Sequence, residues 1–112
     1  MAGLRLSSSR WLAAALLLGA VVAARAAPDG AALYAHYCIP CHGPDGRAHS
    51  PAARKLKAKD LAGSRLPDAD IAHQIANGKK DAAGKQRMPA FKPELTDAEI
   101  AALVGFVKGL RK

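Results

Sequence analysis

The spacing of hydrophobic residues predicts a helix near the end of the chain. Its apolar positions recur at intervals of three and four and share one face: Ile100, Leu103, Val104, Val107 and Leu110. Thr96 and Glu99 have the spacing of a capping box, and Leu95 precedes them where a hydrophobic staple begins. The segment from Leu95 to Leu110 is therefore predicted to be a capped amphipathic helix.

An earlier helix is predicted to begin after Asp29, whose side chain can cap it. Its inner stripe falls at helical spacing: Gly30, Tyr34, Tyr37 and Cys38. Pro40 follows closely, and proline interrupts the hydrogen bonds of a helix interior, so we expect this helix to end or distort there.

A third helix is predicted from Pro67 or Asp68 to Ala76, with Ile71 and Ile75 on one face. Asn77-Gly78 is a typical helix stop. The residues between His42 and Pro67 are rich in turn formers and show little periodicity, and no stretch alternates like a strand. The pattern predicts an all-α domain of three to four short helices and long loops.

The first 26 residues have the pattern of a secretory signal peptide. Arg5 and Arg10 precede an almost unbroken apolar run over 11–24, and Ala24-Arg25-Ala26 has the small residues of a cleavage site. The apolar run is shorter than the ~20 residues that a membrane-spanning helix needs. We therefore expect a cleaved signal peptide at 1–26, a single domain at 27–112 and export to the periplasm.

The main chemical signal is Cys38-Ile39-Pro40-Cys41-His42, which contains the only two cysteines of the chain. This CxxCH spacing is the pattern of covalent c-type haem attachment. In one helical turn Cys38, Cys41 and His42 project from one face. Two thiols so placed can reach the vinyl groups of a porphyrin while the imidazole binds iron.

The motif is also compatible with other chemistries. A thiol redox pair requires a βαβ pattern of strands, which is not visible. A zinc site could use Cys38 and Cys41 with His42 or His49, but a second well-spaced pair is missing. A simple disulfide also remains open. Export favours covalent haem and a disulfide alike, and a short chain with few aromatic residues gains a core from a large cofactor.

Met88 is the second chemical signal, in Gln86-Arg87-Met88-Pro89-Ala90-Phe91. It is the only methionine besides Met1. A lone methionine usually fills core space, but an iron held by His42 needs a sixth ligand, and a thioether there raises the reduction potential. His36, His49 and His73 are the alternative ligands, and a second histidine would lower the potential.

These residues together resemble a small monohaem class I c-type cytochrome of bacteria. The resemblance extends from Gly30 through the CxxCH motif and Met88 to the last helix. It implies a class I cytochrome c fold wrapped around one covalent haem c. By that resemblance Cys38 and Cys41 form thioethers, and His42 and Met88 are the axial iron ligands.

The same resemblance implies two further placements. Gly30 and Phe106 should meet where the first and last helices cross, a small residue against an aromatic one. Pro51 is expected to supply the carbonyl group that orients the His42 ring.

Charge adds an expectation about partners. The chain has 17 basic and 9 acidic residues. The predicted signal peptide contains Arg5, Arg10 and Arg25, so its removal leaves 14 basic residues and a net charge of +5. Two haem propionates would reduce this net charge to about +3. No nucleic-acid motif is present. Acidic surfaces of redox proteins fit better, with membrane contact only through partners. The basic residues gather in two groups: Arg54, Lys55, Lys57 and Lys59, and Lys79, Lys80, Lys85, Arg87 and Lys92.

The predicted function is electron transfer in the periplasm, one electron at a time, between a donor and an acceptor protein. No bond-changing catalysis is expected, so the protein is predicted not to be an enzyme. The alternatives are a haem-bearing subunit of a larger dehydrogenase or oxidase complex and a haem-free zinc or thiol module.

Overall fold

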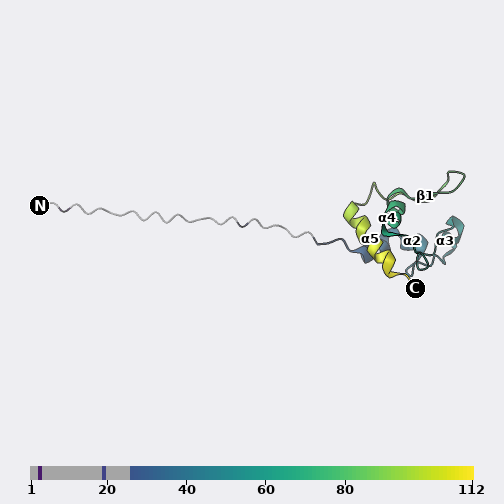
Figure 1. Ribbon diagram of the computed structural model, residues 1–112, viewed down its shortest axis with the longest axis horizontal. Helices are drawn as coiled ribbons and strands as arrows, with labels where there is room; N and C mark the ends of the chain where they lie inside the picture. The colour runs from purple at the N-terminus through teal and green to yellow at the C-terminus, as the bar shows by residue number, and fades with distance from the viewer. Residues whose placement is uncertain (1–2, 4–18, 20–25) are drawn as a thin grey trace.

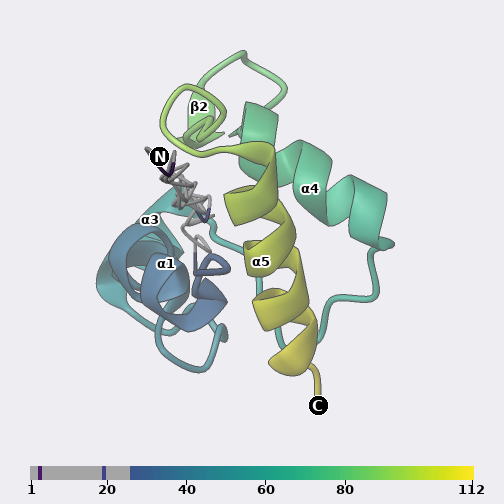
Figure 2. The same ribbon diagram turned by 90° about the vertical axis from the view of Figure 1, so that its left-hand side faces the viewer.

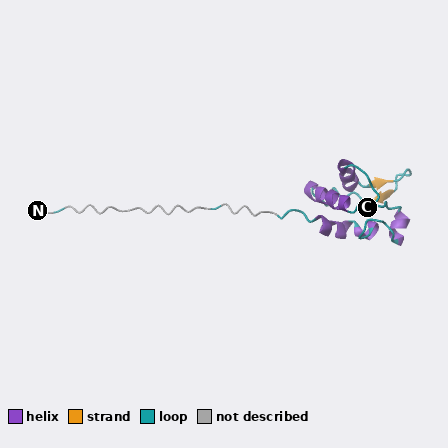
Figure 3. Ribbon diagram, turned by 60° about the horizontal axis from the view of Figure 1, so that its bottom comes forward, coloured by secondary structure: helices purple, strands orange, loops and turns teal. Residues whose placement is uncertain are grey.

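The computed structural model describes Gly3, Gly19 and residues 26–112, so the predicted signal peptide lies almost entirely outside the described residues. The described part is mostly helical, with one small hairpin (Figures 1 and 3). The helices are α1 (Gly30–Tyr37), α2 (Ile39–His42), α3 (Pro51–Leu56), α4 (Asp68–Asn77) and α5 (Asp97–Gly109). The strands are β1 (Lys79–Lys80) and β2 (Gln86–Met88). Among these elements, no helix has the length and hydropathy needed to cross a bilayer.

Helix α1 begins where the sequence predicts and ends at Tyr37, three residues before the predicted interruption at Pro40. The side chain of Asp29 accepts hydrogen bonds from the backbone N–H groups of Ala31 and Ala32, at 3.0 and 3.2 Å. The helix ends at Tyr37, and Cys38 separates it from the four-residue helix α2. Pro40 lies in the first turn of α2, where its missing N–H has no helical partner to lose.

Helices α1 and α5 cross at close range, as Figure 2 shows. A Cβ atom on Gly30 would lie 2.5 Å from the backbone oxygen of Ala102 and 3.3 Å from the Cβ of Phe106. The rings of Tyr34 and Phe106 also pack, with centroids 4.6 Å apart. The predicted meeting of Gly30 with Phe106 is therefore confirmed, and the absence of a side chain at Gly30 is what permits it.

Helix α5 has the predicted capping box. The Thr96 hydroxyl accepts from the Glu99 N–H at 3.1 Å, and the Glu99 carboxylate accepts from the Thr96 N–H at 3.0 Å. Leu95 and Ile100 are both buried in the hydrophobic core. The core extends along the helix to Leu103, one of the two largest fully buried side chains.

Helix α4 runs almost as predicted, with Ile71 and Ile75 buried in the same core. Gly78 ends it at a φ of 69°, a left-handed conformation that glycine adopts without strain. A Cβ atom at this position would also overlap the backbone oxygen of Met88. The glycine therefore lets the chain after α4 lie directly against the Met88 segment.

Two elements differ from the sequence prediction. Five helices are present in the described residues rather than three to four, because α2 is separated from α1 and α3 forms within the expected loop. Ser50 caps α3 by accepting from the Ala53 N–H at 3.0 Å, and Pro51 occupies its first position.

The second difference is an antiparallel hairpin where no strand was predicted. Lys79 pairs with Met88, and Lys80 pairs with Gln86, with an irregularity in register between them. Strands of two and three residues are too short to show alternation, and the hairpin is mostly polar. It nevertheless fixes the backbone of the predicted ligand Met88.

Candidate haem site

A cavity of about 300 Å³ brings together the four residues that the sequence singled out. Cys38, Cys41 and His42 reach it from the end of α1 and from α2, and Met88 reaches it from β2. Its remaining wall is largely apolar and comes from several loops and helices: Tyr37, Leu56, Leu61, Leu66, Ile71, Ile75, Phe91 and Val107. Segments distant in the sequence thus enclose one apolar site.

A backbone carbonyl group forms a hydrogen bond with the His42 ring. Its Nδ1 lies 3.0 Å from the carbonyl oxygen of Lys59. A carbonyl oxygen only accepts, so Nδ1 carries the proton and donates. The lone pair is then on Nε2, the nitrogen available to a metal.

Burial of His42 favours the neutral form of its ring. Burial lowers the pKa of His42 below its usual range, and the hydrogen bond to Lys59 opposes that change. A neutral imidazole is the form that binds iron.

The prediction that the Pro51 carbonyl orients His42 is wrong, since the contact comes from Lys59. Pro51 is the first residue of α3, and carbonyl groups in a helix point along its axis toward later residues. The loop after α3 supplies the carbonyl instead.

Both cysteine thiols are free rather than joined in a disulfide. Cys38 is only 8% exposed, and burial, with a smaller effect of Cys41, raises its pKa to about 11. The more exposed Cys41 lies one turn away on α2. Two unpaired thiols at the edge of an apolar cavity match the attachment chemistry expected of the motif.

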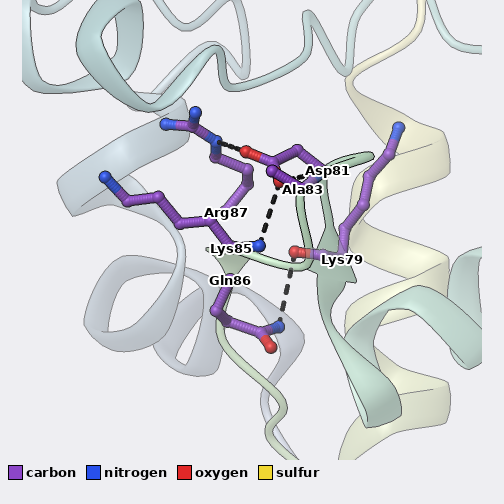
Figure 4. A network of polar contacts seen from close by, with 6 residues as sticks. All are labelled: Lys79, Asp81, Ala83, Lys85, Gln86 and Arg87. Carbon is purple, nitrogen blue, oxygen red and sulfur yellow. Dashed lines mark hydrogen bonds and ion pairs between the residues drawn. The ribbon is translucent and has the colours of Figure 1, made fainter.

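The Met88 segment is held by its neighbours on the hairpin. The Gln86 side-chain amide donates to the Met88 carbonyl oxygen. It also donates, at 3.4 Å, to the carbonyl oxygen of Lys79 (Figure 4). Met88 itself is half-buried and packs against the core. These contacts fix the backbone from which the thioether extends.

The three alternative histidines lie elsewhere. His36 packs edge-on against the Tyr37 ring at 4.6 Å, and the His73 ring contacts the Asn77 amide. His49 is exposed, and none of the three is among the described residues lining the cavity. Cys38, Cys41 and His42 share the cavity, but in the described part of the chain no three histidine, cysteine or acidic side chains are arranged to hold a metal ion such as zinc.

The cavity also fits the acid groups of a haem. Five cationic side chains line it beside the apolar wall: Lys57, Lys59, Lys79, Lys80 and Arg87. Asp81 is the one carboxylate among the described lining residues. An apolar interior with a cationic border is complementary to a porphyrin that carries two propionates.

Comparison with known families agrees with this geometry. Residues 25–107 match the family described as "Cytochrome C oxidase, cbb3-type, subunit III", a c-type cytochrome domain. The chain belongs to this family. It is a small class I c-type cytochrome, and its fold is the cytochrome c fold.

Solved structures of c-type cytochromes are similar to about three quarters of this chain. The KustC0563 c-type cytochrome is 34% identical, with a TM-score of 0.66, over 75% of this chain and 99% of the other. A tyrosine-to-phenylalanine mutant of Kustc0563 is 32% identical, with a TM-score of 0.63, over 74% and 99%. No curated protein sequence matches the chain.

Membership establishes the cofactor and the general role. A c-type cytochrome carries covalently bound haem c with its iron, and its role is electron transport with redox partner proteins. Cytochromes of this kind are generally electron carriers rather than enzymes, and they are typically exported.

Sequence reasoning missed an ion pair at the border of the cavity. The Arg87 Nε lies 2.8 Å from Asp81 Oδ2, and each side chain is 27% exposed. The N–H of Lys85, and then the Arg87 guanidinium, hold the pKa of Asp81 below its usual range. Asp81 lies six positions before Arg87, so only the hairpin turn reveals the pair.

Proposed function

We propose that this cytochrome is a periplasmic carrier of single electrons, with His42 and Met88 as axial ligands of a haem attached through Cys38 and Cys41. The support is the gathering of these four side chains in one apolar cavity. When bound, haem supplies a one-electron couple between ferric and ferrous iron. The chain excludes water and holds the ligands in place.

Each ligand is supported by its own surroundings. The Lys59 carbonyl orients His42 and leaves Nε2 free, as carbonyl oxygens that accept from the other ring nitrogen do for metal-bound histidines. The hairpin fixes the backbone at Met88 through the Gln86 amide. A thioether ligand would favour the reduced iron, which suits a carrier that accepts electrons readily.

Export is part of the proposal. A signal peptide at 1–26 would leave a mature domain at 27–112 in the periplasm, where covalent haem attachment takes place. Mass spectrometry of the purified protein tests this, since cleavage after Ala26 gives Ala27 as the first residue. A mature protein that retains residues 1–26 would contradict it.

The basic residues at the cavity border are proposed to dock acidic redox partners. Lys57, Lys59, Lys79 and Lys80 are exposed and line the mouth of the cavity. Long-range attraction of this kind speeds association and weakens with salt. Changing Lys79 and Lys80 to Gln should slow electron transfer to an acidic partner at low salt. Changing Lys108, which pairs with Asp68 on an exposed surface, should leave the rate unchanged.

A second candidate function is that of a haem-bearing subunit within a dehydrogenase or oxidase complex. The description of the matched family, a subunit of a cbb3-type oxidase, favours it. Purification from the native periplasm separates the two: a free carrier elutes as a small monomer or oligomer, whereas a subunit elutes with an enzyme.

The visible spectrum of the protein, purified from cells equipped to attach haem, tests the central proposal. Haem bands that remain with the chain after acid-acetone extraction, together with a ferric sulfur-to-iron band, are the expected result. In Met88→Ala the sulfur band should vanish, the potential should fall and added cyanide should bind. Leu66→Ala removes an apolar side chain from the same cavity and should keep the band. An unchanged Met88→Ala spectrum would disprove the ligand assignment.

A further inference from the structure

In the Asp81–Arg87 pair the carboxylate has several hydrogen-bond partners, whereas the guanidinium uses only one of its N–H groups. Asp81 Oδ1 accepts from the N–H groups of Ala83 and Lys85, at 3.0 and 2.9 Å, while Oδ2 accepts from Arg87 Nε at 2.8 Å (Figure 4). The carboxylate is thus mounted rigidly on the backbone of the hairpin turn. It fixes the guanidinium through a single N–H.

Four of the five N–H donors of Arg87 remain for another partner. Among the described residues, no acceptor is hydrogen-bonded to its terminal nitrogens Nη1 and Nη2. Figure 4 shows these two nitrogens pointing away from Asp81. The edge they form is a fork whose geometry matches the two oxygens of a carboxylate.

Arg87 differs from the other cations of the cavity border. Lys57, Lys59, Lys79 and Lys80 are exposed, whereas the Arg87 side chain is only 27% exposed. An exposed lysine gains little from an ion pair, because water screens it and its long side chain must be ordered. A sheltered arginine that is already oriented loses less entropy on binding a carboxylate.

From these observations we propose that Arg87 is the haem-propionate-binding residue of the cavity and that Asp81 is its positioning residue. The inference rests on the proposed function, since it requires haem in this cavity. In this proposal the hairpin carries both the propionate-binding residue and the predicted iron ligand, because Arg87 and the adjacent Met88 lie on the same strand. A propionate contact would therefore act next to the predicted ligand as well as on the charge near the iron.

The charges of the pair set the expected direction of each shift in potential. A cation near the iron favours the ferrous form, and an anion favours the ferric form. Arg87→Gln should lower the reduction potential, and Asp81→Asn should raise it. A pair that only stabilised the hairpin would lower thermal stability in both variants and leave the vibrational band of the propionates unchanged.

The experiment is redox titration of the haem-loaded protein, together with resonance Raman spectroscopy of the propionate bending band. Arg87→Gln should move this band, and Arg87→Lys should move it while largely preserving the potential, because the lysine keeps the charge and loses the fork. Lys85→Gln is the matched control: it removes one positive charge from the same hairpin, but its side chain is exposed and is not part of the cavity wall. It should leave the band unchanged and shift the potential less than Arg87→Gln does.

An unchanged band in Arg87→Gln, or a potential shift no larger than that of Lys85→Gln, would overturn the proposal. If such a variant kept its haem and a reversible couple, the electron-carrying function would still stand. Failure of the wild-type protein to show a reversible one-electron couple would instead overturn the proposed function. Should Asp81→Asn fold poorly, Arg87→Lys and Arg87→Gln alone decide the question.

Discussion

The Nδ1 atom of His42 lies 3.0 Å from the carbonyl oxygen of Lys59, a residue on the loop that follows α3. That loop turns at Lys57, which has a φ of 56° and a ψ of 40°. The following N–H, of Ala58, donates to the Ala53 carbonyl oxygen at 2.9 Å. The orientation of a predicted iron ligand thus depends on one left-handed residue at a helix end.

Substitution of Lys57 should reveal this dependence. A left-handed conformation disfavours L-residues by roughly 1–2 kcal/mol and β-branched ones most, whereas glycine adopts it freely. Lys57→Val should therefore be less stable to urea than Lys57→Gly by about that amount, although both remove the same charge. We also expect the valine variant alone to disturb the haem spectrum. Equal stability of the two would contradict the account.

Gly30→Ala should destabilise the α1–α5 crossing. The added Cβ would meet the Ala102 backbone oxygen at 2.5 Å, so the helices must separate, at a penalty of about 1–3 kcal/mol. Gly105→Ala is the control, because Gly105 is in α5 with nothing within 4 Å of the added atom. It should stabilise the protein by roughly 0.5–1 kcal/mol. Urea unfolding of the haem-loaded proteins measures both changes.

Tyr34 should make stability depend on pH at the alkaline end. Burial is the main cause that raises its pKa to about 12, from 10.0. Between these values the unfolded chain loses the phenolic proton more readily than the folded one, so the free energy of unfolding falls as pH rises from 10 to 12.

Tyr34→Phe should remove that part of the pH dependence. At neutral pH it should also lower the free energy of unfolding by about 1 kcal/mol, because the hydroxyl donates to the Gly43 oxygen at 2.7 Å. Unfolding curves at pH 8 and pH 11 for both proteins test this. A parallel decline of the two between these pH values would assign the titration to other groups.

Thr96→Ala should weaken the start of α5. The variant loses the hydroxyl that accepts from the Glu99 N–H, which lowers stability by about 1 kcal/mol. Thr96→Ser keeps an accepting oxygen and should retain most of the stability. Thermal unfolding of the two haem-loaded variants distinguishes a capping role from simple loss of side-chain volume.

The sequence predicted the elements that carry their own local signals. Helices α1, α4 and α5 have caps or stops and apolar stripes, and the fold class follows from them. The motif at 38–42 and the single downstream methionine were sufficient to select four residues that share one cavity. Their roles as attachment points and ligands stay predictions.

The features that were missed have weak or no local signals. A backbone carbonyl such as that of Lys59 is common to every residue, so no sequence pattern indicates which one reaches His42. Ser50-Pro51 did offer an N-cap followed by proline, but six residues of helix are too few to show a period. The Asp81–Arg87 pair forms only once the hairpin has folded back on itself.

The crossing of α1 with α5 has a consequence for folding kinetics. Gly30 and Ala102 lie near opposite ends of residues 26–112, so their contact closes a loop that contains most of these residues. The entropy lost in such a closure grows with loop length, and contacts of large sequence separation slow the search for the native state. The cysteine motif, by contrast, follows α1 directly and can form its helical turn locally. The segment that receives the haem is therefore organised by short-range interactions, and we expect docking of the two terminal helices to limit the rate of folding.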